Sequence, residues 1–138
     1  MTNKVGWTCG AFDLLHSGHI ELLKDCKTKC DYLIVGLQSD PSIDRSEKNK
    51  PIQSIEERLI MLKAIKYVDK VVIYHTEADL LALLKLIKPD IRINGIDWKG
   101  KPFTGHELDM EYHYHSRNHN WSSSDLRRRV YKAEQRNF

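Results

Sequence analysis

One stretch near the start of the chain, residues 9–20, constrains the fold more than any other. Its sequence is Cys9-Gly10-Ala11-Phe12-Asp13-Leu14-Leu15-His16-Ser17-Gly18-His19-Ile20. The residues before it, 4–9, are short and apolar enough for an interior strand. After it, apolar side chains recur at helical spacing, at Ile20, Leu22, Leu23 and Cys26. The stretch therefore predicts a strand, a glycine-containing turn and a helix in succession.

Two imidazoles, His16 and His19, lie three residues apart where this predicted helix begins. Residues with that spacing share one face of the first helical turn, beside backbone N–H groups that have no intrahelical partner. Small residues around the histidines let a bulky anion approach the main chain; they are Gly10, Ala11, Ser17 and Gly18. The combination predicts a phosphate site. A helix cap, or a metal held by the two histidines, is the alternative.

The rest of the chain alternates between strand and helix signals. Apolar or alternating runs predict strands over residues 32–37, 68–74, 91–94 and 111–115. Between them, Ser54 and Glu57 form a capping box that opens one helix, and the leucine-rich residues 79–87 form another that ends before Pro89. Such alternation implies right-handed crossovers. We predict a single α/β domain over residues 1–138, a Rossmann-like doubly wound sheet of about five parallel strands with helices on both faces.

Composition restricts the class of protein. The 138 residues carry 30% charged side chains and a net charge of +3, which does not indicate a nucleic-acid partner. No apolar run approaches the length of a membrane span, and Met1 leads towards the first strand without a signal peptide, so we expect no membrane partner and a cytoplasmic location. Cys9, Cys26 and Cys30 form no C-x-x-C pair, so we expect reduced, structural cysteines, with Cys9 close to the site.

Two loops follow predicted strands at the edge where such sheets bind ligands. The first carries Lys48 and Lys50, which are candidates either for phosphate contacts or for a solvated loop. The second begins with Asp97 and Trp98; the tryptophan can stack on a base or wall a pocket, and the carboxylate can accept hydrogen bonds from a base or a sugar. Packing of Trp98 over an apolar edge is the alternative. We expect residues 99–107 to influence the choice of acceptor.

The predicted strand 111–115 alternates, which brings His113 and His115 to one face. These histidines match no zinc-ligand spacing, and alternating histidines on an edge strand are usually solvated, so we predict no metal held by the protein.

Three hydroxyls, Ser122, Ser123 and Ser124, precede a helical run that contains three arginines, residues 127–129. Capping needs only one serine, so the three predict a second phosphate cradle that faces the histidines. We expect the arginines to form a solvated helix face and not an RNA site.

The stretch from Gly10 to His19 resembles the G-T-F-D-L-L-H-x-G-H motif of the cytidylyltransferases, in the H-x-G-H nucleotidyltransferase superfamily; Ala11 replaces the threonine. Gly95-Ile96-Asp97-Trp98 is similar to the family's G-x-D-W element, as in glycerol-3-phosphate cytidylyltransferases. Residues 117–124 resemble its second signature, R-T-E-G-I-S-T-T, with Arg117 and the three serines matching and residues 118–121 departing. Arg58 matches an arginine in the family's E-x-R helix.

The resemblance implies transfer of CMP from CTP to glycerol 3-phosphate or a similar polyol phosphate, with release of pyrophosphate, Mg²⁺ as cofactor and a homodimer. The segment Lys50-Pro51-Ile52 also resembles the R-P-I element of heptose-phosphate adenylyltransferases, so ATP with a sugar phosphate is the alternative. A non-catalytic nucleotide-binding domain is a further alternative, which the intact histidines, arginine and serines disfavour.

Roles for individual residues follow from the motifs and the resemblance together. The base would lie near Asp97 and Trp98, the α-phosphate over the histidines, and the other phosphates near Arg117 and the serines. The expected catalytic residues are His16, His19, Lys48 and Arg117. The expected nucleotide contacts are Gly10, Ala11, Phe12, His16, Ser17, Gly18, His19, Asp97, Trp98, Arg117, Asn118, Trp121, Ser122, Ser123 and Ser124. The expected acceptor contacts are Lys48, Lys50 and Arg58.

Overall fold

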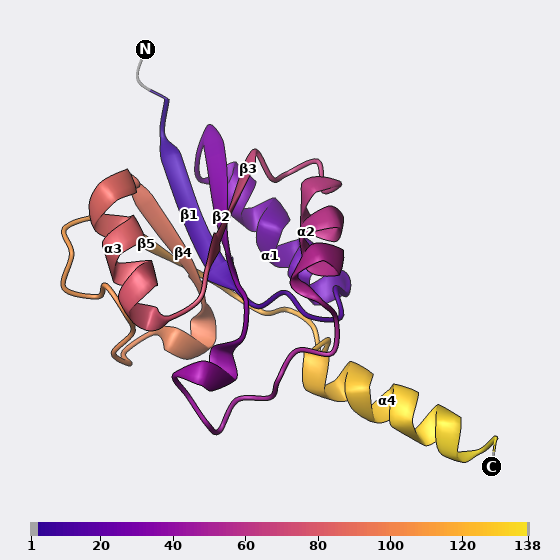
Figure 1. Cartoon of the computed structure of the whole chain (residues 1–138). Coiled ribbons are helices and arrows are strands. Elements are labelled where there is room, and N and C mark those ends of the chain that lie inside the picture. The colour runs from indigo at the N-terminus through magenta and orange to yellow at the C-terminus, as the bar shows by residue number, and fades with distance from the viewer. Residues whose placement is uncertain (1–2, 138) are drawn as a thin grey trace.

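A computed structural model describes residues 3–137 as one five-stranded parallel sheet with helices packed around it (Figure 1). The elements are β1 (Val5–Gly10), α1 (Ser17–Thr28), β2 (Tyr32–Gln38), α2 (Ile55–Lys63), β3 (Lys70–Tyr74), α3 (Glu77–Ile87), β4 (Ile91–Gly95), β5 (Glu111–His115) and α4 (Ser123–Gln135). Short 3₁₀ turns lie at Pro41–Ile43 and Ile96–Trp98. The predicted Rossmann-like sheet is confirmed.

The strand order is β3-β2-β1-β4-β5, with every neighbouring pair parallel. The chain builds outwards from β1 to β3, then crosses back and continues from β4 to β5 on the other side of β1. The order therefore reverses between β1 and β4. In open parallel sheets, the crevice outside the carboxyl ends of the strands at such a reversal is where ligands bind.

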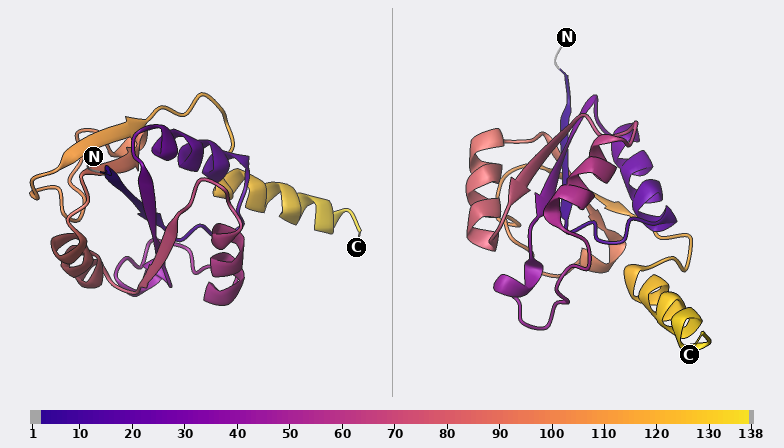
Figure 2. Two further views of the ribbon diagram at one scale, coloured as in Figure 1. Left: turned by 90° about the horizontal axis from the view of Figure 1, so that it is seen from above. Right: turned by 45° about the vertical axis from the view of Figure 1, so that its right-hand side comes forward.

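Two apolar cores lie on opposite faces of the sheet. Successive residues of β2 point alternately to the two faces, so Leu33, Val35 and Leu37 pack with α1 and α2, whereas Ile34 packs on the other side. That other core holds Trp7 with residues of α3. Figure 2 shows the same division, with α1 and α2 on one side of the sheet and α3 on the other.

Two predicted boundaries were wrong by two residues. Helix α3 begins at Glu77 and not at residue 79, because Thr76 caps it and exchanges hydrogen bonds reciprocally with Asp79. Strand β3 begins at Lys70 and not at residue 68, because the Val68 N–H still closes the turn after α2 by bonding to the Ile65 carbonyl.

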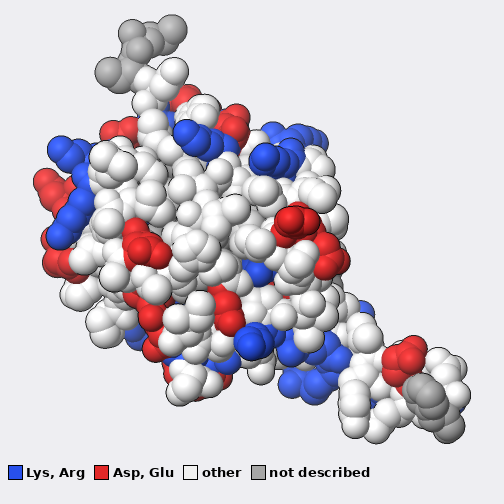
Figure 3. All heavy atoms as spheres, viewed as in Figure 1, with Lys and Arg blue, Asp and Glu red and all other residues white. Residues whose placement is uncertain are grey.

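Helix α4 leaves the body of the molecule and has no buried residue (Figure 1). Lys and Arg side chains gather where it departs (Figure 3). Arg128 and Arg129 are exposed, as predicted, but Arg127 is half-buried and lies 3.7 Å from the Asp13 carboxylate. The first turn of α4 is therefore the part that contributes to the site. Within residues 3–137, no helix is long and apolar enough to cross a membrane.

Candidate active site

The two histidines at the start of α1 hold each other in place through main-chain hydrogen bonds. His16 is the N-cap, and its Nδ1 accepts a hydrogen bond from the Gly18 N–H at 3.0 Å. His19 Nδ1 accepts one from the His16 N–H at 3.1 Å, which completes a capping box made of two imidazoles. The ring centroids are 4.0 Å apart. The alternative role of these histidines as a helix cap is therefore observed, and the phosphate site stays a prediction.

This capping fixes which nitrogen of each ring can donate. A neutral imidazole that accepts a hydrogen bond at Nδ1 carries its proton on Nε2. Both rings are therefore held as Nε2–H donors, and His16 Nε2 lies 3.2 Å from Ser123 Oγ. Paired N–H donors beside a helix N-terminus are suited to hold the oxygens of a phosphate.

Burial keeps both histidines uncharged near neutral pH. Desolvation, with the nearby His16 ring as a smaller contribution, lowers the pKa of His19 to about 4. Desolvation also lowers the pKa of His16, helped by the positive fields of His119 and Arg117. The pair thus acts through oriented N–H dipoles and not through full positive charges.

The turn between β1 and α1 has an unusual backbone that neighbouring segments support. Phe12 and Leu14 have positive φ angles of 49° and 52°, which are uncommon for such side chains. Phe12 is 5% exposed, and its ring packs against that of His19 with a centroid distance of 5.4 Å. The Asp13 carboxylate accepts hydrogen bonds from the main-chain N–H groups of Ile52 and Gln53.

Arg58 is buried beneath the loops that surround the site and does not line a substrate pocket. The acceptor contact expected for it from the sequence is therefore corrected. Its side chain is 2% exposed, and its guanidinium donates to the carbonyl oxygens of Ala11, Gln38 and Ser39. These carbonyls belong to the last residue of β2, to the residue after it, and to the turn that follows β1. The arginine therefore joins the site's loops to α2.

The serines at the start of α4 do face the histidines, as predicted. Ser122 Oγ caps the helix by accepting from the Asp125 N–H, which leaves the other two hydroxyls free of that task. Ser123 and Ser124 line a cavity of about 260 Å³ that lies between the two helix starts. Its other lining residues are Ala11, Phe12, Asp13, His19, Pro41, Lys48, Asn49, Pro51 and Arg127. Lys50 is exposed and does not line this cavity.

A second cavity, of about 210 Å³, continues from the histidines towards β5. Its lining residues are His16, Gly18, His19, Leu22, Gly95, His115, Arg117, His119, Trp121, Ser122 and Ser123. Arg117 is held there by the Trp121 carbonyl at 2.7 Å and by Asp97 at 3.4 Å. Asn118, another expected nucleotide contact, is exposed and lies outside this lining.

Two histidines of this cavity were not predicted from the sequence. His119 stacks on Trp121 at 4.8 Å, and its Nδ1 accepts from the Trp121 N–H. His115 and His113 both contact Asp25 of α1, so the prediction that they are solvated was wrong. The period-2 pattern put them on one face, but the carboxylate that they share lies about ninety residues earlier in the chain.

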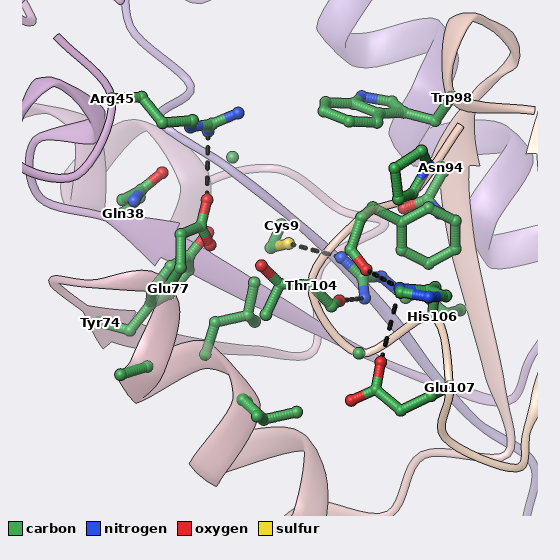
Figure 4. A pocket seen from close by; sticks show the side chains of 18 residues that line it. Cys9, Gln38, Arg45, Tyr74, Glu77, Asn94, Trp98, Thr104, His106 and Glu107 are labelled. Carbon is green, nitrogen blue, oxygen red and sulfur yellow. Dashed lines mark hydrogen bonds and ion pairs between the residues drawn. The ribbon is translucent and has the colours of Figure 1, made fainter.

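A third cavity, of about 660 Å³, lies over the carboxyl ends of β1, β2, β3 and β4 (Figure 4). Trp98 lines it, whereas Asp97 does not and pairs with Arg117. That both residues flank one base stays a prediction. The loop 99–107 supplies a wall, from Pro102 to Glu107.

Buried polar atoms without partners gather in this large cavity. Within the described part of the chain, four of its lining residues each have such an atom: Arg45 Nε, Glu77 Oε2, Arg92 Nε and Asn94 Nδ2. Arg45 and Glu77 pair across it at 3.3 Å (Figure 4). Buried polar groups of this kind normally have a partner, so the cavity is suited to a ligand rich in hydroxyl or phosphate oxygens.

A family model described as cytidylyltransferase-like matches residues 7–129. The chain belongs to the cytidylyltransferase-like family. The matched region includes the paired histidines, the strand-end cavities and the serine-capped start of α4. The predicted resemblance to the H-x-G-H nucleotidyltransferases is confirmed.

Curated relatives of this family member share the name bifunctional protein HldE. The protein from Helicobacter pylori is 39% identical over 124 residues, which cover 89% of this chain and 27% of that protein. The protein from Campylobacter fetus is 42% identical over 106 residues, which cover 76% and 23% respectively. The chain thus spans about a quarter of the length of these relatives.

Solved structures share the fold of this family member. A lipopolysaccharide core biosynthesis protein from Thermoplasma volcanium aligns with a TM-score of 0.61 at 24% identity, covering 96% of this chain and 90% of that one. A bifunctional NMN adenylyltransferase/ADP-ribose pyrophosphatase from Francisella tularensis, complexed with AMP and a manganese ion, aligns with a TM-score of 0.64 at 16% identity, covering 95% and 42%.

Proposed function

We propose that this chain transfers a nucleoside monophosphate, AMP in the first instance, from a nucleoside triphosphate to a sugar phosphate and releases pyrophosphate. The observation that carries the proposal is the pair of histidines that cap α1, whose Nε2–H groups face the start of α4, which is capped by Ser122. Two helix N-termini, four hydroxyl or imidazole donors and nearby cations converge there on one small volume. That convergence is suited to a triphosphate.

The α-phosphate would lie over His16 and His19, and the two outer phosphates near Lys48, Arg127 and the serine hydroxyls. A phosphate oxygen of the acceptor attacks the α-phosphorus in line; one P–O bond forms, and the bond to the bridging oxygen breaks to release pyrophosphate. The attacking oxygen is already ionised at neutral pH, so the step needs no strong base. The chain contributes positioning and stabilisation of the charge that develops on the phosphates.

Magnesium would enter with the triphosphate. Among residues 3–137, no three His, Cys, Asp or Glu side chains gather closely enough to hold a metal ion. Asp13, the carboxylate nearest the phosphate cavity, already accepts two main-chain hydrogen bonds. Mg²⁺ is often held by substrate phosphates and water with few protein ligands, and it would neutralise charge on the triphosphate. We therefore treat it as part of the substrate.

The acceptor would occupy the large cavity beside β1. This cavity opens at the carboxyl ends of the strands, as does the histidine site, and Gly10 of β1 belongs to its wall. Its unpartnered donors and its acceptor, Glu77 Oε2, match a ligand that offers several hydroxyl groups. A sugar phosphate has that chemistry.

ATP is favoured over CTP by two observations. Lys50-Pro51-Ile52 resembles the element of heptose-phosphate adenylyltransferases, and the HldE relatives fit that branch better than the glycerol-3-phosphate cytidylyltransferases. Trp98 lines the large cavity, which Asp97 does not, so the two residues give less support to the shared base contact that favoured CTP. The G-I-D-W segment keeps CTP with a polyol phosphate as the second candidate.

Pyrophosphate release separates these candidates. The chain would be incubated with Mg²⁺ and either ATP or CTP, in the presence of sugar 1-phosphates, glycerol 3-phosphate or no acceptor. We expect release that depends on both ATP and a sugar 1-phosphate. Release only with CTP and glycerol 3-phosphate would reverse the assignment, and release with neither triphosphate for any acceptor would contradict nucleotidyl transfer.

A further inference from the structure

His115 lines the 210 Å³ cavity and forms a hydrogen bond with Asp25, and the mechanism above uses neither residue. His115 Nδ1 lies 2.8 Å from Asp25 Oδ2. The imidazole is 12% exposed, and its other nitrogen, Nε2, is buried without a partner among the described residues. His115 lines the pocket that we assign to the nucleotide, and Nε2 is the ring nitrogen that Asp25 does not occupy.

Asp25 determines which of the two nitrogens carries the proton. Burial by itself raises the pKa of Asp25, but hydrogen bonds from His115 and then His113 outweigh it, so the pKa is lowered and the group remains a carboxylate. A carboxylate only accepts hydrogen bonds, so Nδ1 of His115 must be the N–H donor. In the neutral ring, Nε2 then presents a lone pair.

This tautomer is the reverse of the one held by the other histidines of the cavity. His16, His19 and His119 each accept a main-chain hydrogen bond at Nδ1 and so present Nε2–H. Those three are suited to phosphate oxygens. A lone pair at His115 would repel a phosphate oxygen, so its partner must be a donor.

The position of His115 agrees with a nucleoside partner. His115 is the last residue of β5 and pairs in register with Gly95, the residue immediately before the 3₁₀ turn that carries Asp97. It therefore lies between the histidine pair and the segment that we expect to flank the base. The donors on a nucleoside are its ribose hydroxyls and its exocyclic amine.

We propose that His115 Nε2 accepts a hydrogen bond from the nucleoside part of the bound triphosphate, and that Asp25 is a positioning residue that fixes the accepting tautomer. The inference rests on the proposed function, because it requires that a nucleoside triphosphate occupies this cavity. His113 provides an internal control: it contacts the same Asp25 oxygen at 3.1 Å but does not line the cavity.

The test compares equilibrium binding of a triphosphate with binding of three analogues that each lack one donor. The parent is whichever of ATP and CTP supports turnover; the analogues are its 2′-deoxy form, its 3′-deoxy form, and ITP or UTP, in which oxygen replaces the amine. Wild type should bind one analogue about fivefold to tenfold more weakly than the parent, the effect of one neutral hydrogen bond. His115→Phe should bind the parent weakly by the same factor and should not discriminate against that analogue.

Three further variants exclude a general structural effect. His115→Gln keeps an acceptor near the Nε2 position and should bind within about threefold of wild type. Asp25→Asn should weaken binding of the parent, because an amide donor facing Nδ1 would place the proton on Nε2. His113→Gln should bind like wild type, and thermal denaturation would confirm that each variant is folded.

The outcomes separate this inference from the proposed function. If wild type binds and turns over the parent but His115→Phe still discriminates against every analogue as wild type does, the nucleoside contact is wrong and the transferase stands; an ordered water then satisfies Nε2. Equal losses in His113→Gln and His115→Phe would also overturn it. If wild type binds no nucleoside triphosphate, the proposed function and this inference fail together.

Discussion

At the scale of single residues, the two ring nitrogens of each histidine at the start of α1 have different roles. In His16 and His19, Nδ1 stabilises the start of α1 and Nε2 faces the cavity. The spacing of the two histidines could be read from sequence, but the tautomer could not, because it depends on which main-chain N–H groups the folded turn presents. The partners of His115 and His119 were missed for the same reason.

Substitution at His19 can separate these two tasks. An asparagine oxygen approximates the position of Nδ1 and a glutamine amide that of Nε2. His19→Asn should therefore keep the helix cap but lose the donor, and its turnover should fall by about 10²–10³, as for loss of one charge-stabilising donor. His19→Gln should keep much more of the activity but lose about 1 kcal/mol of stability with the cap. The rate of pyrophosphate release and urea unfolding of both variants measure the two effects. An asparagine variant with the wild-type rate would contradict the assigned role.

The lowered pKa of His19 also predicts how stability depends on pH. The unfolded histidine binds a proton near its ordinary pKa of about 6.5, whereas the folded one does so only near about 4. Between these values the unfolded state binds more protons, so the free energy of unfolding should fall as pH is lowered through this window. His16 acts in the same direction. Urea unfolding at pH 7, 6 and 5 checks this; His19→Asn should show a smaller decrease, and an identical decrease would contradict it.

At the scale of elements, alternation of strand and helix signals was sufficient to predict the parallel sheet and its five strands. The packing partners of Arg58 were not predictable, because its carbonyl acceptors belong to the end of β2 and to the turn after β1, which come together with α2 only in the folded chain. A charged side chain in an amphipathic helix is usually exposed, and no sequence pattern distinguishes one that is buried.

Loss of the Arg58 contacts should destabilise the whole site. Arg58→Met keeps the volume of the aliphatic stem but leaves three buried carbonyl oxygens without their donor, and we expect a loss of about 3 kcal/mol or more in the free energy of unfolding. Arg128→Met, on the exposed face of α4, should change it by less than about 0.5 kcal/mol. Urea unfolding of both variants provides the comparison, and similar stabilities would mean that Arg58 does not hold the loops.

At the scale of the whole molecule, two ligand regions meet at the end of β1 on opposite sides of the sheet, one beside α1 and the other beside α3. The histidines and serines lie on one side and the large cavity on the other, and Gly10 or its neighbour Ala11 borders the cavities on both sides. The sequence predicted the first region because its residues are contiguous in two motifs. Of the second region it indicated only Trp98 and the loop 99–107, because the other lining residues come from four strands, α3 and the loop after β2, which are far apart in the sequence. The homodimer implied by resemblance stays a prediction.

This separation predicts that a substitution in one region changes the KM for one substrate and not for the other. Asn94 carries a buried, unpartnered amide in the large cavity and does not line either smaller one. Asn94→Ala should raise the KM for the acceptor by about tenfold and leave the KM for the triphosphate within about twofold. Shortening the loop 99–107 should act in the same direction. Equal increases in both KM values would contradict the division.

The most direct measurement for the central claim follows the fate of two labelled phosphates. Wild-type chain would be incubated with Mg²⁺, a sugar 1-phosphate and ATP that carries label either at the α- or at the γ-position. Nucleotidyl transfer over the histidine pair predicts that the α-label appears in the sugar product and the γ-label in pyrophosphate, with both appearing about 10²–10³ times more slowly in His19→Asn. Appearance of the γ-label on the sugar, or transfer of the α-label by the variant at the wild-type rate, would contradict the account.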